Sequence, residues 1–128
     1  MENKKIKVAL LGLGTVGGGV YKLIQRRSES MIHTVGAELE VEKILVHSLH
    51  KKREGVDTEL LTTDWKSIVN DPEIQIVIEV MGGIEPAKTY ILDALHAGKH
   101  VVTANKDLIA VYGRELLDAA EEQHCDLL

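Results

Sequence analysis

A glycine-rich turn directly after an apolar run constrains this chain more than any other feature. The apolar run covers residues 6–11, and the turn reads Gly12-Leu13-Gly14-Thr15-Val16-Gly17. Glycines at this spacing let the backbone approach a pyrophosphate closely, and a helix starting at Thr15 turns its N–H groups and positive dipole end toward the anion. Because the turn lies between a buried strand and an amphipathic helix, we interpret it as a dinucleotide site. The alternative is a tight turn that binds nothing.

Composition excludes several classes of function. The chain of 128 residues has the size of one globular domain. It contains no Phe, one Trp and three Tyr, and its net charge is −5 with the basic residues spread out, so we expect no nucleic-acid partner. The single cysteine, Cys125, cannot form an internal disulfide or a multi-cysteine metal site. We also expect no membrane span, no signal peptide and a cytoplasmic location.

Strand-like and helix-like segments alternate along the chain. Strands are expected at residues 6–11, 41–46, 74–81 and 100–103, with a short edge strand at 60–62 and the start of another at 125–128. Helices are expected at 15–27, at 64–69, from Pro86 to just before Gly98, and at 114–123, with a polar connection over 28–40. This order predicts an α/β fold of the Rossmann type. It is a doubly wound, mainly parallel sheet with helices on both faces, and it forms one domain over residues 1–128.

The end of the second strand bears on the choice of cofactor. A site that prefers NAD usually has Asp or Glu there to bond the ribose 2′-hydroxyl. This chain has His47-Ser48, followed by Lys51, Lys52 and Arg53. Without a repelling carboxylate, these cations can hold a 2′-phosphate, which favours NADP slightly over NAD or allows both. The alternative is a solvated basic loop.

A lysine follows the strand at 100–103, in the segment Thr103-Ala104-Asn105-Lys106. At the carboxyl end of a strand, its ammonium group can approach a carbonyl oxygen beside a nicotinamide, and there it can donate a proton or stabilise negative charge. An ordinary surface lysine is the alternative, and the spacing alone does not decide between them.

Two further signals receive a structural interpretation. Glu79 lies inside a buried strand, and we expect a partnered carboxylate that orders the neighbouring glycine loop rather than one that contacts a ligand. The histidine pairs His47/His50 and His96/His100 lack the additional ligands that zinc requires, so we expect no metal site.

Three blocks of this sequence resemble the nucleotide-binding half of homoserine dehydrogenase. They run from Gly12 to Val20, from Val77 to Gly83 and from Gly98 to Lys106, and together the similarity covers essentially the whole chain. The resemblance implies NAD(P)-dependent interconversion of L-homoserine and L-aspartate 4-semialdehyde, a step in threonine, methionine and isoleucine biosynthesis. It also implies a catalytic role for Lys106, with Thr103 and Asn105 at the nicotinamide end.

The same resemblance implies that backbone at Met81 and Gly82 passes beneath the nicotinamide. Where the family often has an arginine beside the adenosine, this chain has His47, which leaves the cofactor preference open. The family's substrate domain, second catalytic lysine and dimerisation region would follow residue 128. We therefore expect a fragment that binds cofactor but is not fully active, with the amino-acid substrate bound and a homo-oligomer formed only by the full-length enzyme.

Two other functions remain open from the sequence. One is a non-catalytic dinucleotide-sensing module. The other is the cofactor domain of a different amino-acid-pathway reductase, acting on aspartate semialdehyde or dihydrodipicolinate. The Thr-Ala-Asn-Lys block argues for the dehydrogenase over both.

Overall fold

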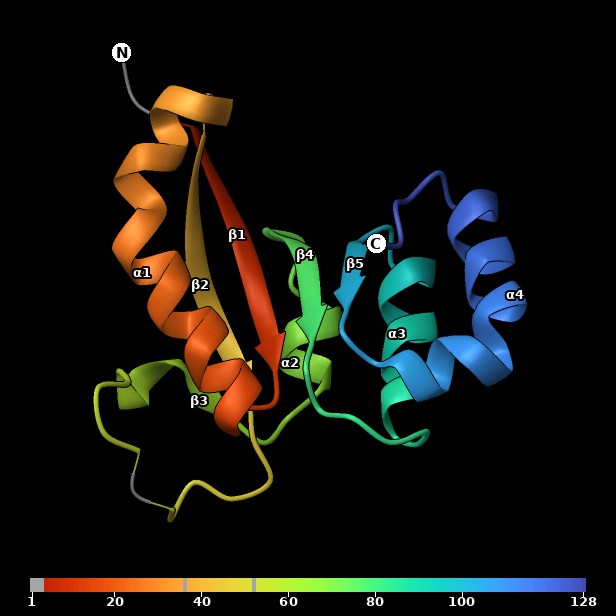
Figure 1. Cartoon of the computed structure of the whole chain (residues 1–128), viewed down its shortest axis with the longest axis horizontal. Coiled ribbons are helices and arrows are strands. Elements are labelled where there is room, and N and C mark those ends of the chain that lie inside the picture. Colours follow the sequence, from red (N-terminus) through yellow and green to blue (C-terminus); the bar gives the residue numbers. More distant parts are fainter. Residues whose placement is uncertain (1–3, 36, 52) are drawn as a thin grey trace.

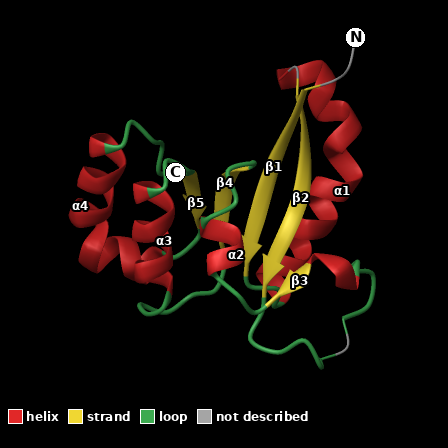
Figure 2. Cartoon of the chain, turned by 180° about the vertical axis from the view of Figure 1, so that it is seen from behind, coloured by secondary structure: helices red, strands yellow, loops and turns green. Residues whose placement is uncertain are grey.

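The computed structural model describes residues 4–35, 37–51 and 53–128, with the backbone alone over 28–35. Five parallel strands form one sheet in the order β3-β2-β1-β4-β5 (Figure 1). The expected parallel α/β architecture is therefore confirmed. The strands are β1 Lys4–Leu11, β2 Ala37–Leu45, β3 Leu61–Thr62, β4 Ile74–Glu79 and β5 His100–Thr103. The helices are α1 Thr15–Val35, the 3-10 turn η1 Thr58–Leu60, α2 Lys66–Val69, α3 Ala87–His96 and α4 Lys106–Glu122 (Figure 2).

Strand β1 lies at the centre of the sheet and is buried on both faces. Val8 and Leu10 pack on the side of α1, against Tyr21 and Ile24. Ala9 and Leu11 point to the other side, into the core formed with α2, α3 and α4. Successive side chains of a strand alternate between faces, and both faces of this sheet are covered, so the strand is apolar at every position from Val8 to Leu11.

Helix α1 is longer than the sequence analysis expected, and the polar connection over 28–40 is wrong. The helix continues to Val35, and β2 begins at Ala37, where it pairs with Lys4. The crossover must carry the chain back along the whole of β1, which is about 26 Å for eight residues. A helix over 15–27 spans only about 20 Å, whereas 21 residues span about 31 Å. The length of the parallel pair therefore requires the extra turns.

Helix α4 begins eight residues earlier than the expected Arg114, directly after the Thr-Ala-Asn segment. Asn105 caps it, because its Oδ1 accepts a hydrogen bond from the Leu108 backbone N–H at 3.1 Å. Leu108 and Leu116 are both fully buried on the face that meets α3 and the sheet. The cap and this buried face extend the helix across Gly113.

The short helices α2 and α3 agree with their sequence signals. Asp64 accepts a hydrogen bond from the Lys66 N–H at 3.0 Å as α2 begins, and Gly98 follows α3 with a φ of +81°. The expected strand 74–81 ends at Glu79. At the other edge of the sheet, Leu127 pairs in parallel with Val101, as expected of the tail.

Lys99 is a buried lysine that joins two turns at the amino ends of β4 and β5. Its side chain is 4% exposed, and its Nζ donates hydrogen bonds to the Asp71 and Ile74 carbonyl oxygens at 2.6 and 2.7 Å. Burial lowers the pKa of its ammonium group, and the nearby Asp71 carboxylate partly opposes that change.

Replacing Lys99 with Met should reduce the free energy of unfolding by about 1–3 kcal/mol, because two carbonyl oxygens lose their donor while the side-chain volume is kept. In the folded chain the pKa of Lys99 lies below its ordinary value of 10.5. Between that lowered pKa and 10.5, the unfolded chain binds more protons than the folded chain. The stability of the wild type should therefore rise relative to Lys99→Met as the pH increases through that window.

Urea unfolding of the two chains at several pH values measures both effects. Lys66→Met is the matched control, because Lys66 is exposed on α2 and should change stability by less than about 0.5 kcal/mol. Equal stability of Lys99→Met and Lys66→Met would contradict the anchoring role.

Candidate functional site

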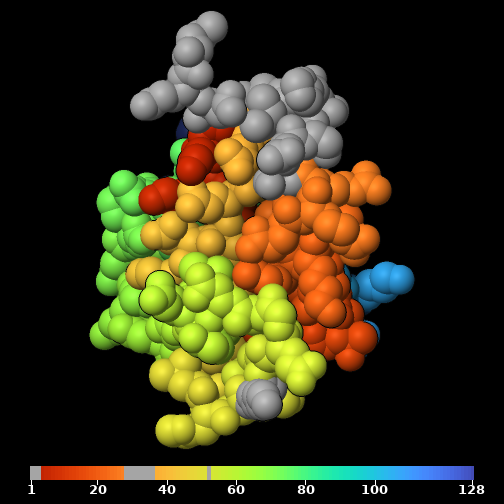
Figure 3. Space-filling model, turned by 90° about the vertical axis from the view of Figure 1, so that its left-hand side faces the viewer, coloured from red at the N-terminus to blue at the C-terminus, as the bar shows by residue number. Residues whose placement is uncertain are grey.

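The strand order places a binding crevice at one end of the sheet. From β1 the chain proceeds outward to β2 and β3, and then returns to the other side of β1 with β4 and β5. Ligands of such sheets bind outside the carboxyl ends of the strands, where the order reverses. The loops after β1, β2, β4 and β5 all leave from that end (Figure 1). Figure 3 shows the loop after β2, in yellow, at the same end of the molecule as the first turns of α1.

The glycine turn after β1 is shaped by two close approaches. Gly12 has a φ of +104°, and its N–H donates to the Leu45 carbonyl oxygen at 2.9 Å, which ties the turn to the end of β2. A Cβ on Gly17 would collide with the Gly12 carbonyl oxygen. A Cβ on Gly14 would meet no atom within 4 Å. Gly12 and Gly17 are therefore required by the packing of the chain itself, whereas Gly14 faces open space.

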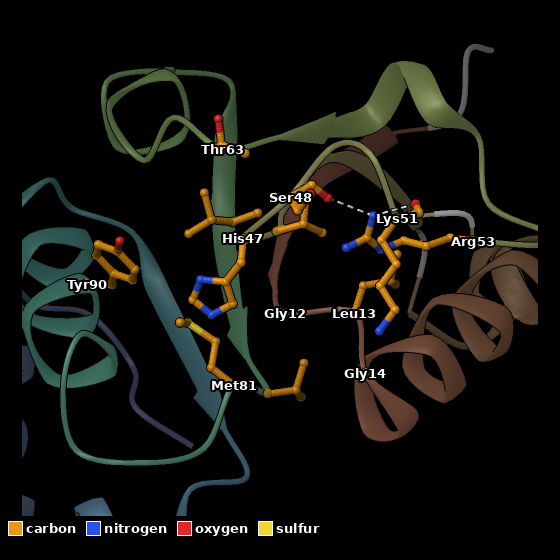
Figure 4. A pocket seen from close by; sticks show the side chains of 13 residues that line it. Gly12, Leu13, Gly14, His47, Ser48, Lys51, Arg53, Thr63, Met81 and Tyr90 are labelled. Atoms are coloured by element: carbon orange, nitrogen blue, oxygen red, sulfur yellow. Dashed lines mark hydrogen bonds between the residues drawn. The ribbon is translucent and has the colours of Figure 1, made fainter.

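A cavity of about 440 Å³ opens beside this turn (Figure 4). Eight of the residues that the sequence analysis selected line it: Gly12, Leu13, Gly14, His47, Ser48, Lys51, Arg53 and Met81. Among the lining residues that the structure describes, none is acidic. The cavity thus joins the glycine turn, the basic loop after β2 and the end of β4 in one concave surface.

Arg53 organises the basic loop. Its Nη1 donates hydrogen bonds to the backbone carbonyl oxygens of Ser48 and Lys51, at 2.9 and 3.0 Å. The Ser48 Oγ in turn accepts a hydrogen bond from the His50 N–H at 3.2 Å. Lys52, the third cation of the segment, lies outside the described residues. Lys51 is exposed and Arg53 is half-buried, so the cavity carries positive charge at this rim.

Five lining residues were not selected from the sequence: Leu45, Val46, Thr63, Val80 and Tyr90. Thr63 follows β3 directly, so the rule that identifies strand ends could have found it. Tyr90 is different, because it comes from the middle of α3, whose periodicity indicates only a core face. Its ring lies 4.6 Å from that of Trp65, centroid to centroid, and the Trp65 indole N–H donates to Asp93 at 3.1 Å.

A second, more apolar cavity of about 480 Å³ lies at the end of β5. Its lining includes Thr103, Asn105 and the exposed Lys106, which is the first residue of α4, together with Ala104, Ile109 and Ala110. The structure therefore places eight of the selected residues around the first cavity and three around the second. Thr15, Val16, Gly17 and Gly82 line neither cavity.

A buried polar network joins the two loops that approach these cavities. The Glu79 carboxylate, fully buried at the end of β4, accepts hydrogen bonds from the Met81 and Gly82 backbone N–H groups at 2.9 and 3.1 Å, and from the Thr103 hydroxyl. Thr103 Oγ1 accepts from the Asn105 N–H at 3.0 Å. Asn105 closes the network, since its Nδ2 donates to the Gly83 carbonyl oxygen at 2.6 Å.

Other kinds of site find little support in the described parts of the chain. There, no three His, Cys, Asp or Glu side chains gather as metal ligands. His100 is engaged instead with the C-terminal segment, because its Nδ1 accepts the Asp126 N–H at 2.9 Å. None of the helices described here combines the length and apolarity needed to cross a membrane.

The glycine turn fits a diphosphate. Just before α1, the Gly14 carbonyl oxygen accepts the Gly18 N–H at 2.8 Å. The helix amides that come before Gly18 have no acceptor within the helix. These amides begin at Thr15, directly after the open space at Gly14. A helix N-terminus beside a cavity with no acidic lining suits a bound anion.

Comparison with known proteins gives a consistent family. Residues 12–128 match the family model described as "Homoserine dehydrogenase, NAD binding domain". The chain is 53% identical over 125 residues to homoserine dehydrogenase of Bacillus subtilis, covering 97% of this chain and 29% of that protein. The crystal structure of S. aureus homoserine dehydrogenase superimposes with a TM-score of 0.92 at 44% identity, covering 98% of this chain and 32% of that one.

A third match is the structure of a homoserine dehydrogenase from Thiobacillus denitrificans, with a TM-score of 0.89 and 45% identity. It covers 97% of this chain and 29% of that one. The chain thus spans about 30% of the length of the relatives that it matches.

The glycine turn yields a prediction about stability. Gly17→Ala should lower the free energy of unfolding by about 1–3 kcal/mol, because the new Cβ forces α1 away from the Gly12 carbonyl. Gly14→Ala adds the same methyl group in open space and should change it by less than about 0.5 kcal/mol. Urea titration followed by circular dichroism compares the pair. Equal stabilities would contradict the close contact.

Proposed function

This chain belongs to the homoserine dehydrogenase family, whose NAD-binding domain it matches over residues 12–128, and from that premise we propose how it holds its nicotinamide dinucleotide. The observation that carries the proposal is the glycine turn, in which Gly12 and Gly17 serve the fold and Gly14 leaves space for a ligand. The diphosphate would bind to the amides that begin α1, between the two cavities. The two halves of the dinucleotide would then extend to opposite sides of β1.

The cavity beside the basic loop is proposed to hold the adenosine half. It is lined by residues from the ends of β1, β2 and β4, and by Tyr90 of α3. Lys51 and Arg53 supply positive charge at its rim, and its described lining has no carboxylate that would repel a 2′-phosphate. We therefore propose that NADP binds more tightly than NAD. Because His47 stands between Met81 and the basic loop in this cavity (Figure 4), we assign it to the adenosine side.

The cavity at the end of β5 is proposed to lie at the nicotinamide end. The nicotinamide exchanges a hydride with the carbon of an aldehyde or alcohol when the cofactor is bound. In this chain, the Lys106 side chain would stabilise negative charge on the substrate oxygen, or donate a proton to it, from its exposed position on the first turn of α4. Thr103 and Asn105 would fix the loop that carries it, through their hydrogen bonds to Glu79 and Gly83.

We propose residues 1–128 as the cofactor-binding domain of a longer homoserine dehydrogenase. The support is the coverage, since the chain spans about 30% of the relatives that it matches. The amino-acid substrate, a second catalytic lysine and the contacts of a homo-oligomer would come from the remaining part of such an enzyme. A cytoplasmic location is part of the same proposal and is supported by the single cysteine.

Lys51→Ala should weaken binding of NADP⁺ by about 3- to 10-fold, because one cation near the 2′-phosphate is removed. Binding of NAD⁺, which lacks that phosphate, should stay within about twofold. Isothermal titration of the 128-residue chain measures both affinities. Lys22→Ala on α1 is the control, since Lys22 does not line the cavity. An equal loss of affinity for both dinucleotides would show that Lys51 does not recognise the 2′-phosphate.

Lys106→Met should abolish most turnover without loss of cofactor. The chain alone is expected to bind NADP⁺ but not to oxidise homoserine. The assay therefore uses a chimera in which this chain replaces the corresponding residues of a full-length homoserine dehydrogenase. In that chimera Lys106→Met should lower kcat by roughly 100-fold or more, with the Kd for NADP⁺ nearly unchanged.

The control in the chimera is Lys66→Met, which removes another exposed lysine and should leave kcat unaltered. Retention of full kcat in Lys106→Met would exclude the catalytic role and favour a domain that only senses the dinucleotide. Homoserine oxidation by the isolated chain would overturn the proposed division into domains.

A further inference from the structure

We propose that Glu79 holds a fixed negative charge behind the nicotinamide end of the site, and that this charge makes the chain bind the oxidised, cationic cofactor more tightly than the reduced, neutral one. The inference rests on the proposed function, because it requires the nicotinamide half to lie over the ends of β4 and β5. It concerns a residue that, by its burial, cannot contact the cofactor itself.

The hydrogen bonds around Glu79 all run toward its carboxylate. Oε2 receives the Met81 and Gly82 N–H groups, and Oε1 receives the Thr103 hydroxyl. The Thr103 hydroxyl donates in this direction while its oxygen accepts the Asn105 N–H. A protonated carboxyl group would need an acceptor for its own O–H. Its described neighbours are two backbone N–H groups, which are donors, and the Thr103 hydroxyl, which already donates to it. The network is therefore complete for an ionised side chain, which is acceptor-only.

The charge of Glu79 is not cancelled by a cation in the described part of the chain. None of the ion pairs found there includes Glu79, although its side chain is 0% exposed. Three hydrogen bonds stabilise the carboxylate, yet they leave its net charge in place. A buried charge without a counter-ion exerts an electrostatic potential on its surroundings that solvent screens poorly.

Glu79 lies directly behind the walls of both cavities. Met81, whose N–H binds one carboxylate oxygen, lines the cavity beside the glycine turn. Thr103, whose hydroxyl binds the other oxygen, lines the cavity at the end of β5. A ligand that reaches from one cavity to the other passes over the backbone to which Glu79 is bonded. In the proposed orientation the nicotinamide occupies the cavity at the end of β5, where the Thr103 hydroxyl binds this carboxylate.

The oxidised nicotinamide ring carries one positive charge and the reduced ring carries none. A fixed negative charge behind the ring therefore stabilises the oxidised form selectively, and its removal should cost about 3- to 10-fold in affinity for that form. If Glu79 only holds the loops in place, its replacement should weaken the oxidised and reduced cofactors equally. The ratio of the two affinities separates these roles, and neither needs a turnover assay.

The experiment titrates the 128-residue chain and its Glu79→Gln variant with NADP⁺, NADPH and 2′-phospho-ADP-ribose by calorimetry. Glutamine keeps the shape of the side chain and removes its charge. We expect the affinity for NADP⁺ to fall about 3- to 10-fold, while those for NADPH and for the ligand without nicotinamide change less than twofold. Glu73→Gln is the matched control, because Glu73 lies just before the opposite end of β4, exposed beside Lys7.

Equal losses of affinity for NADP⁺ and NADPH, which leave the ratio of the two affinities unchanged, would overturn the proposal. If Glu79→Gln does not fold by circular dichroism, a second measurement decides. In Lys106→Met, which removes the charged side chain among the residues lining the β5 cavity, NADP⁺ should bind more tightly than its analogue with an uncharged benzamide ring. Equal affinities there would also overturn it. If the wild-type chain binds none of these ligands, the proposed function fails instead.

Discussion

The contact between Gly12 and Gly17 is the constraint on which the rest of this structure depends. It allows α1 to begin immediately after β1, so that the amino end of the helix stands against the carboxyl ends of the strands. Because the Gly12 N–H also binds the Leu45 carbonyl oxygen, the same turn fixes the end of β2 and the loop that follows it. One cavity wall is thereby set by packing that needs no ligand, which makes it a preformed surface for an anion.

The second constraint is electrostatic and lies on the other side of β1. The β4 and β5 loops are joined by hydrogen bonds to one buried carboxylate and one asparagine. Such a network has discrete geometry, since each donor needs its acceptor at one distance and direction. Asn105 belongs to it and also caps α4, so the start of the helix that carries Lys106 is fixed to the same two loops.

The sequence was most informative where local chemistry decides the structure. The glycine turn, the apolar run of β1 and Gly98 after α3 each require a particular backbone, and all lie where expected. The wrong boundaries have a different cause. The end of α1 depends on the length of the strand that it crosses, and the start of α4 depends on a cap that serves a distant loop. Both requirements come from tertiary structure, so the helical periodicity of the sequence does not reveal them. Tyr90 was missed for the same reason.

The two cavities differ in character, and this difference gives the proposed orientation its physical basis. One has a basic rim formed by Lys51 and Arg53, and a phosphorylated ribose is the part of a dinucleotide that benefits most from such charge. The other is mainly apolar, and behind it lies a carboxylate with no described counter-ion. An uncharged or cationic ring suits that end, whereas a phosphate does not. In the proposed orientation, the chain would therefore distinguish the ends of an extended ligand by charge, in addition to shape, with the glycine turn between them.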